Sequence, residues 1–228
     1  MYAADYDTGE IFIYDIIGDP WFGMIGAENV IGDLAKMQGK RVTVRLSSPG
    51  GSVSEGVAIY NALQRHRGGV DTVVDASAYS IAHYIMQAGE RRVVAKNSTT
   101  MLHKPWTIAG GNAGELRAVA DRLDKFEDSV LETYVDRTGK TADEMRAIFA
   151  GIGAEDGTWY TAAEAVAAGF ADEVGDIAPE TAPAFASAMF GKEPKGQRQQ
   201  EPQAGTRTPW AIQPRAIRRE TMRAIFGR

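Results

Sequence analysis

The sequence predicts an α/β domain with a layered architecture and a mostly parallel sheet, followed by one long helix and a C-terminal tail. Short apolar runs rich in β-branched residues alternate with segments of helical spacing, which is typical of parallel strands joined by helical crossovers. Glycine and proline turns separate these segments. An uninterrupted amphipathic stretch over residues 113–137 predicts the long helix.

The first half of the chain supplies three predicted strand–helix pairs. Alternation of apolar residues over 10–17 predicts the first strand, which a Gly-Asp-Pro turn ends. A helix follows over 27–37, because apolar residues recur there at spacings of three and four until a glycine stops the pattern. By the same reasoning we expect strands at 41–46 and 70–75 and helices at 52–65 and 80–88.

The second half begins with two short strands, at 92–95 and 99–103, before the long helix. A helix at 142–149 follows, and a capping box formed by Thr161 and Glu164 opens another that runs to residue 168. The apolar stripe of the long helix can close onto the core of its own chain or onto another subunit, and both alternatives stay open. That stripe consists of Leu116, Val119, Leu123, Phe126, Val130 and Tyr134.

Beyond residue 178 the chain is rich in Pro, Gln, Arg and Gly, a composition typical of segments without a packed core. We therefore expect a folded domain at 1–178 and a flexible tail at 179–228, in which 211–226 forms a short helix only on a partner. Residues 191–228 hold nine Lys/Arg and three Glu, a net +6, although the whole chain carries −5. Such a tail contacts an acidic partner or stays solvated, and the charge pattern leaves both readings open.

Composition restricts the classes of function. A chain of 228 residues that is 44% hydrophobic can bury a core of its own. The absence of cysteine excludes a disulfide framework, a thiolate metal site and a cysteine nucleophile. No apolar run is long enough to cross a membrane, and residues 1–10 lack the basic segment of a secretory signal. We expect a cytoplasmic protein that uses no metal or cofactor and binds neither membrane nor nucleic acid.

A turn with the sequence Ser-Ser-Pro-Gly-Gly-Ser-Val, residues 47–53, connects a predicted strand to a predicted helix. Gly50 and Gly51 allow the backbone to turn with positive φ and to expose its amides. Ser52 and Glu55 have the spacing of a capping box that begins the next helix. Amides gathered at a helix N-terminus suit an anion or a developing oxyanion, although a plain strand-to-helix turn has the same composition.

Ser80 stands at the start of the short helix predicted after strand 70–75. The helix dipole favours negative charge near its oxygen, and the amide of Ile81 is placed to join the oxyanion donors. The segment is not the G-x-S-x-G elbow of α/β-hydrolases, since Ala78 and Ala82 occupy the glycine positions. Serine also commonly caps helices, so the position alone does not identify a nucleophile.

A serine nucleophile needs a neighbouring base, and three histidines are candidates. His66 lies between two arginines at the polar end of a helix, where we expect it to be solvated. His83 follows Ser80 by three residues on one helix and points along that helix, which is typical of a buried or interface histidine. His103 ends a separate strand and can approach Ser80 directly. We therefore predict that His103 is the base.

A carboxylate should complete the group by orienting the imidazole. The candidates lie in residues 154–161, just before the helix that Thr161 caps. Several acidic residues occur nearby, so chance proximity is an alternative explanation.

These segments together resemble the signatures of the Clp protease proteolytic subunits, in the same order over residues 11–174. Residues 47–60 are similar to the family pattern S-P-G-G-S-V followed by G-x-A-I-Y, and residues 78–89 to its nucleophile segment, A-A-S followed by a helix ending in A-G. Residues 101–105 are similar to its h-h-H-x-P histidine segment. Residues 159–172 are similar to F-L-S-A-x-E-A-x-x-Y-G-L-V-D.

The resemblance implies a ClpP/crotonase-like layered fold and a serine endopeptidase that acts on proteins or peptides. Ser80 would be the nucleophile, His103 the base, and the amides of Gly51 and Ile81 the oxyanion hole. The family also implies a homo-oligomer, a heptameric ring or double ring, with the long helix of this chain used for oligomerisation. An extended substrate would pair with backbone on both sides of the site, at Gly50, Ser52, Val53, Lys104 and Trp106.

The sequence departs from the family pattern at two places. Ala76 stands where the family usually has glycine, which is tolerated if its φ is negative. The family places its aspartate two residues before the aromatic of F-L-S, a position that Gly157 occupies here. Asp156 lies one position earlier, and we predict it as the third catalytic residue, with Glu155 as the alternative. A dyad assisted only by the backbone or a hydroxyl group such as that of Thr158 also stays open.

The short opening strand, the Gly-Asp-Pro-Trp-Phe-Gly turn and the basic tail look most like the Clp-like prohead proteases of tailed phages. That subgroup cleaves scaffold and capsid proteins during head maturation, in the host cytoplasm or the immature phage head. The alternative is a housekeeping subunit that works with an ATPase unfoldase.

Three further functions compete with these. Acyl-CoA hydratases and isomerases share the scaffold and use two backbone amides without a serine nucleophile. A Ser-Lys peptidase would use Lys96 or Lys104 as its base. A non-enzymatic assembly protein would have kept the fold and lost the activity.

Overall fold

The computed structural model describes residues 1–151 and 157–175. The predicted tail at 179–228 and the two acidic candidates, Glu155 and Asp156, therefore lie outside the described residues. The strands are β1 (Tyr2–Asp5), β2 (Glu10–Ile13), β3 (Val42–Ser48), β4 (Val70–Tyr79), β5 (Arg91–Ala95), β6 (Thr99–Leu102), β7 (Thr158–Thr161) and β8 (Glu173–Gly175). The helices are η1 (Pro20–Phe22), α1 (Ala27–Lys36), α2 (Val53–Gln64), α3 (Ile81–Met86), α4 (Ala113–Thr138), α5 (Ala142–Ala150) and α6 (Ala162–Ala167).

The strands form one sheet in the order β1-β2-β3-β4-β5-β8, and β6 and β7 extend it from β4. The pairs β2–β3, β3–β4, β4–β5, β4–β6 and β5–β8 are parallel, whereas β1–β2 and β6–β7 are antiparallel. The prediction of a layered α/β domain with a mostly parallel sheet is confirmed.

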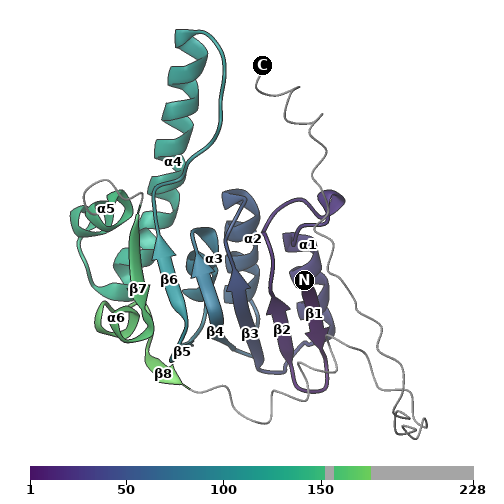
Figure 1. Ribbon diagram of the computed structural model, residues 1–228. Coiled ribbons are helices and arrows are strands. Elements are labelled where there is room, and N and C mark those ends of the chain that lie inside the picture. Colours follow the sequence, from purple (N-terminus) through teal and green to yellow (C-terminus); the bar gives the residue numbers. More distant parts are fainter. Residues whose placement is uncertain (152–156, 176–228) are drawn as a thin grey trace, which may run out of the picture. The chain divides into compact units, whose positions relative to one another are not determined.

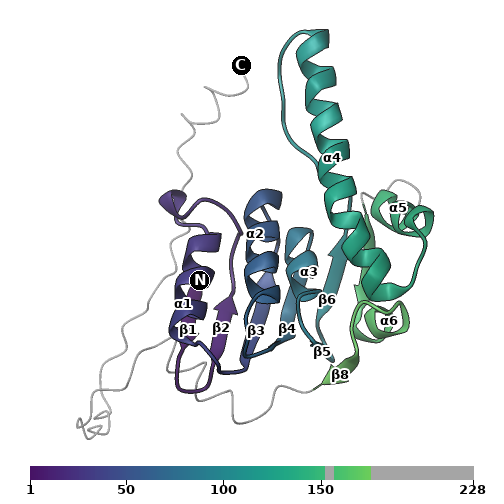
Figure 2. The same cartoon turned by 180° about the vertical axis from the view of Figure 1, so that it is seen from behind.

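Helices α1, α2 and α3 lie side by side on one face of the sheet, and Figure 2 shows them in front of the strands. Alternate residues of the central strands point into this layer, so that Ile11 pairs in register with Val44 and Ile13 with Leu46, all four fully buried. Residues of parallel strands buried beneath helices stabilise the fold through the apolar area they remove from water.

The opposite face of the sheet carries a buried ionic cluster. Arg45 donates from Nε to Asp75 Oδ2 at 2.9 Å, and its Nη1 lies 3.4 Å from Glu10 Oε1. Tyr14 also donates to the Asp75 carboxylate. The three charged side chains are each less than one tenth exposed. Their charges are therefore compensated by one another rather than by water.

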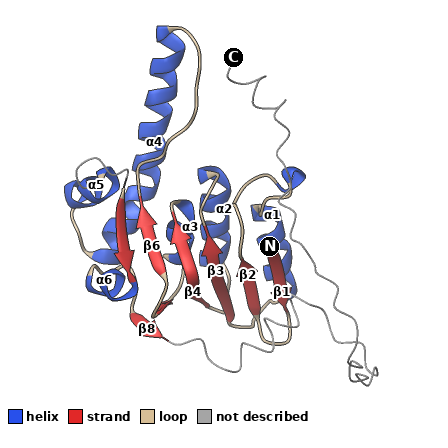
Figure 3. Cartoon of the chain, in the orientation of Figure 1, coloured by secondary structure: helices blue, strands red, loops and turns tan. Residues whose placement is uncertain are grey.

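Strand β4 is longer than predicted because it pairs with two different strands along its length. Its first half, Asp71 to Val74, pairs with β5, and its last residues, Ser77 to Tyr79, pair with β6. The second half consists of small and polar residues that no hydrophobic alternation marks as a strand. As a result, β3, β4 and β6 are neighbours whose carboxyl ends lie at the same edge of the sheet (Figure 3).

Strands β1, β7 and β8 were not predicted. Each has only three or four residues, and their side chains are half-buried or exposed, so apolar alternation is weak. They become strands because β2, β6 and β5 offer unpaired edges.

One predicted cap is only partly correct. The Ser52 hydroxyl accepts a hydrogen bond from the Glu55 amide at 3.4 Å, as expected for the first residue before α2. The Glu55 carboxylate does not return to this helix but accepts from the Ala27 amide, at 2.7 Å, in the first turn of α1. Glu55 therefore joins the start of α1 to the start of α2.

Helix α4 packs against the domain only through its C-terminal half (Figure 1). Glu127, Val130, Leu131 and Tyr134 are buried, whereas Leu116 and Phe126 of the predicted stripe are 43% and 40% exposed. The stripe thus closes partly onto the core of its own chain, and its N-terminal part projects past the sheet. No helix of residues 1–151 and 157–175 has the length and apolar character needed to cross a membrane.

Candidate active site

Three segments leave the carboxyl ends of β3, β4 and β6 and meet there. Ser48 is in register with Ala78, and Tyr79 with Met101, so the turn at 49–53, the start of α3 and the residues after β6 become neighbours. Open parallel sheets bind ligands at this edge because loops from adjacent strands converge on it. The parallel register therefore brings together sequence motifs that lie about 30 and 20 residues apart along the chain.

Ser80 has a strained backbone, with φ 55° and ψ −127°. It is the only non-glycine residue with positive φ in the described part of the chain, so Ala76 has the negative φ that its side chain requires. The Ser80 amide donates to Met101 O at 2.9 Å, and its carbonyl accepts from the His83 amide at 3.0 Å. Its hydroxyl makes no capping bond to α3. Strain at such a sharp strand-to-helix turn is typical of nucleophilic serines.

The Ser80 hydroxyl is hydrogen-bonded to His103, with 2.8 Å between Oγ and Nε2. His103 follows the last residue of β6 directly, and β6 runs parallel to the end of β4, so the imidazole approaches the serine from the neighbouring strand. This distance lies within the range expected of a nucleophile and its base.

His83 takes a different position although it is closer in sequence. It is fully buried, and its Nδ1 lies 3.1 Å from the hydroxyl of Tyr134 on α4. Burial, together with the nearby positive charge of Arg92, lowers the pKa of His83 to about 3. The neutral imidazole of His83 packs between Tyr134 and Phe170 as part of the core, and the Ser80 hydroxyl is not its hydrogen-bond partner. His66, the third candidate, contacts a different group: its Nε2 lies 2.7 Å from the Lys40 carbonyl oxygen.

Two backbone amides near Ser80, those of Gly51 and Ile81, have no acceptor in the described part of the chain. Ile17 holds the residues on either side of Gly51, because Ile17 N donates to Gly50 O and Ser52 N donates to Ile17 O, each at 2.8 Å. A parallel bridge of this kind leaves the Gly51 N–H pointing away from Ile17. In the described part of the chain neither this amide nor that of Ile81 donates to a protein acceptor.

Glycine is required at both positions of the turn. Gly50 and Gly51 have φ of 92° and 144°, which side chains disfavour. A Cβ at Gly50 would lie 2.7 Å from the Ser80 Cβ, and one at Gly51 would lie 2.0 Å from Ile17 O. The missing side chain of Gly50 allows the turn to approach the nucleophile, and that of Gly51 allows the turn to pair with Ile17.

A cleft of about 410 Å³ opens over the Ser80 hydroxyl. Of the residues predicted to bind substrate, Gly50, Val53 and Trp106 line it, and Ser52 lines an adjoining cavity. Lys104 lines neither cavity. Its ammonium lies 3.5 Å from the Glu127 carboxylate, and its amide donates to Phe149 O at 3.1 Å.

A small apolar pocket of about 40 Å³ opens beside the nucleophile, and sequence reasoning missed most of its wall. Its lining comes from α3, α4 and α5 as well as the active-site loops: Val53, Ser80, Ile81, Tyr84, Leu102, His103, Pro105, Val130, Tyr134 and Phe149. The residues of α4 and α5 belong to ordinary amphipathic patterns, so no sequence signal distinguishes them from other core residues.

The acid that would orient His103 is not among the positions that the structure describes. Asp156 and Glu155 both lie in the undescribed segment 152–156. The Thr158 hydroxyl, the proposed substitute, donates instead to Ile148 O at 2.7 Å. Lys104 is held by Glu127, so it does not serve as the base of a Ser-Lys pair. The described residues contain no group of three or more His, Asp or Glu side chains that could hold a metal ion.

Comparison with known proteins agrees with this geometry. The profile of the Clp protease family matches residues 4–178. The proteolytic subunit 2 of the ATP-dependent Clp protease of Thermobifida fusca is 32% identical over 154 residues, which cover 65% of this chain and 73% of that protein. The proteolytic subunit 1 from Leifsonia xyli subsp. xyli is 32% identical over 162 residues, covering 70% of this chain and 80% of that protein. The chain belongs to the Clp protease family, whose members are peptidases.

Proposed function

We propose that this chain is a serine endopeptidase of the Clp type, with Ser80 as nucleophile, His103 as base and Asp156 as the acid that orients the base. The observation that carries this proposal is the 2.8 Å hydrogen bond between Ser80 Oγ and His103 Nε2, next to two unused backbone amides. The strained backbone of Ser80 also supports the proposal, because such strain costs stability and is concentrated at functional sites.

The reaction is acyl transfer. His103 Nε2 removes the proton from the Ser80 hydroxyl as Oγ attacks the peptide carbonyl, and the Gly51 and Ile81 amides stabilise the oxyanion that forms. The protonated His103 then gives its proton to the departing amine, which leaves an acyl-enzyme ester on Ser80. Water, deprotonated by His103, hydrolyses the ester and regenerates the serine.

The pocket beside Ser80 supports a preference for certain side chains on the substrate residue whose carbonyl is attacked. Its wall is almost entirely apolar, and its volume of about 40 Å³ leaves little room below the nucleophile. Small apolar side chains fit such a pocket without loss of hydrogen bonds, whereas a charged side chain would be desolvated there. We therefore expect cleavage after small apolar residues.

Labelling with a fluorophosphonate probe tests the nucleophile directly. The wild-type protein should be labelled and should cleave peptides, whereas Ser80→Ala should lose both properties. Ser129→Ala, at an exposed position on α4, serves as the control and should keep both. Labelling that persists in Ser80→Ala would place the nucleophile elsewhere. A wild-type protein that is not labelled would favour the hydratase-like or non-enzymatic alternatives.

The relatives reported above are proteolytic subunits of ATP-dependent Clp proteases, so they favour the housekeeping type over the phage prohead protease. On this basis we propose that the chain forms a homo-oligomeric ring and degrades protein substrates with an ATPase partner. Mass photometry measures the ring size. Degradation of a folded substrate only with a Clp-type ATPase and ATP would support the housekeeping function, whereas processing of a capsid or scaffold protein without ATP would support the prohead function.

A further inference from the structure

The cleft over Ser80 continues into a second cavity that leads away from the nucleophile. The second cavity has a volume of about 420 Å³ and shares Gly51, Val53, Pro105 and Trp106 with the cleft. These shared residues make the two cavities one groove. A peptide that lies extended across Ser80 advances about 3.3 Å per residue, so its residues several positions from the scissile bond enter the second cavity.

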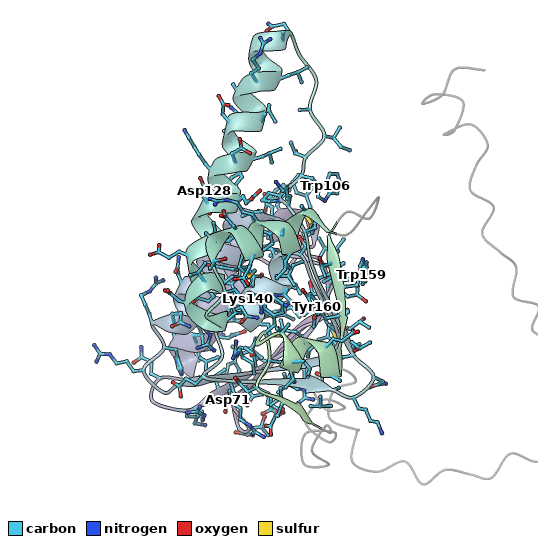
Figure 4. All side chains as sticks on the ribbon, turned by 90° about the vertical axis from the view of Figure 1, so that its left-hand side faces the viewer. Asp71, Trp106, Asp128, Lys140, Trp159 and Tyr160 are labelled. Atoms are coloured by element: carbon cyan, nitrogen blue, oxygen red, sulfur yellow. The ribbon has the colours of Figure 1, made fainter. Side chains whose placement is uncertain are left out.

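The far end of the groove is built by the projecting half of α4 and the loop that leads to it. Trp106 and Ile108 come from the loop, and Leu123 and Phe126 come from the helix. Figure 4 shows Trp106 at the base of the projecting part of α4. These apolar side chains are exposed or half-buried, so a bound peptide would remove them from water.

Arg122 is the only charged residue among those that line the groove in the described part of the chain. It forms no ion pair with another described residue, unlike Arg91, Arg92 and Arg146, which all contact carboxylates. A guanidinium next to aromatic and aliphatic side chains is a good partner for a carboxylate, because it binds both oxygens at once and is weakly hydrated.

We propose that Arg122 is a specificity-determining residue, which selects peptides that carry an Asp or Glu several positions from the scissile bond, beside apolar residues. This inference rests on the proposed peptidase function, because it assigns the second cavity to the substrate of Ser80. Phe126, Leu123 and Trp106 would bind the apolar neighbours of the acidic residue. The acidic body of the chain offers no competing carboxylate within the groove itself.

Binding to the full-length Ser80→Ala variant tests the inference without depending on turnover. The probes are fluorescent peptides with a fixed alanine, the residue after which cleavage is expected. One other position, at increasing distance on either side of this alanine, carries Glu, Gln or Lys. Fluorescence anisotropy gives the Kd of each peptide. We expect one position at which the Glu peptide binds about three- to tenfold more tightly than the Gln peptide, the range of a partly exposed charge-assisted contact. Added salt should reduce this ratio.

Substitutions in the same Ser80→Ala background assign the effect to one side chain. Arg122→Ala should bring the Glu-to-Gln ratio close to one, and Arg122→Glu should favour the Lys peptide. Arg117→Ala is the matched control, since Arg117 lies on the same exposed half of α4 but does not line the groove. It should leave the ratio unchanged. Equal binding of the Glu and Gln peptides at every position, or an equal fall in Arg117→Ala, would overturn the inference.

The same peptides, given to the wild-type protein, separate the two proposals. Cleavage with fluorophosphonate labelling of Ser80 but no preference for Glu would refute only the role of Arg122. A binding preference that depends on Arg122, found together with an unlabelled Ser80, would refute the peptidase mechanism and leave a peptide-binding groove. A preference in both binding and kcat/KM that disappears in Arg122→Ala would support both.

Discussion

Gly157 lies directly against His103, so closely that a Cβ built on Gly157 would be 2.6 Å from the His103 Cβ and 2.3 Å from Leu102 O. Its φ of 104° also disfavours any side chain. Gly157 occupies the position at which the Clp family pattern has its aspartate. The backbone of this chain therefore has no room for an aspartate at position 157, and an acid that orients His103 would have to come from another position.

We predict that Gly157→Ala and Gly157→Asp both lose stability and activity. The backbone strain and the clash with Leu102 O should lower the free energy of unfolding by about 2–4 kcal/mol, because the β6 backbone cannot move without shifting His103. Gly39→Ala is a matched control, since Gly39 also has positive φ but has open space around it. It should cost only about 1 kcal/mol and leave cleavage unchanged. Urea denaturation and peptide cleavage measure both effects, and an active, stable Gly157→Asp would contradict the explanation.

Asp156→Ala should lower kcat by about 10⁴-fold, because an imidazole without its orienting carboxylate adopts the wrong tautomer and orientation. Glu155→Ala should change kcat little. The acid is identified by comparing kcat of the two variants with that of the wild type, each at the same concentration of protein that a fluorophosphonate can label. The reverse order would assign the role to Glu155, and two fully active variants would indicate a Ser-His dyad.

Arg45→Met should be strongly destabilising, by about 3–5 kcal/mol, because it leaves the Asp75 and Glu10 carboxylates buried without their cation. Arg91→Met is the control, since Arg91 pairs with Glu173 while both side chains are largely exposed. That change should cost at most about 1 kcal/mol. Urea denaturation at neutral pH measures the difference, and equal effects would show that the ionic cluster does not contribute through burial.

The stability of the domain should fall as the pH drops below about 6.5, in part because of His83. Burial lowers the pKa of His83 from 6.5 to about 3, so between these values the unfolded chain binds a proton that the folded chain does not. The free energy of unfolding then decreases by about 1.4 kcal/mol per pH unit from this group. His83→Gln should be less stable at neutral pH but should show a weaker dependence on pH.

Urea denaturation at several pH values between about 4 and 7 measures that slope. His66→Gln, at a histidine near the surface, is the control and should keep the wild-type slope. If His83→Gln keeps it as well, the acid sensitivity arises from other groups.

Much of the fold could be predicted from the sequence, because its main elements carry strong local patterns. The apolar alternation of β2 and β3, the spacing in α1 and α2, and the cap formed by Thr161 and Glu164 depend on neighbouring residues only. The short edge strands β1, β7 and β8 could not be predicted, since their backbone pairs with strands that other parts of the chain provide. The same holds for the second half of β4.

The chemistry of the site divides in the same way. The residue types and their order in the sequence determined that Ser80, His103 and the Gly50-Gly51 turn are the candidates, since the family patterns fix each of them locally. The sequence favoured His103 over His83 as the base, but only the tertiary structure shows which imidazole contacts the Ser80 hydroxyl. The parallel pairing of β4 with β6 brings His103 to 2.8 Å from the serine, and the packing of α3 on α4 buries His83 against Tyr134.

The tertiary structure alone also produced the pocket beside Ser80, the groove that ends at Arg122, and the exclusion of an acid at position 157. The physical reason is common to all three. Each depends on the distance between side chains or backbone atoms from elements far apart in the chain, and local sequence patterns set the conformation of an element but not what it packs against.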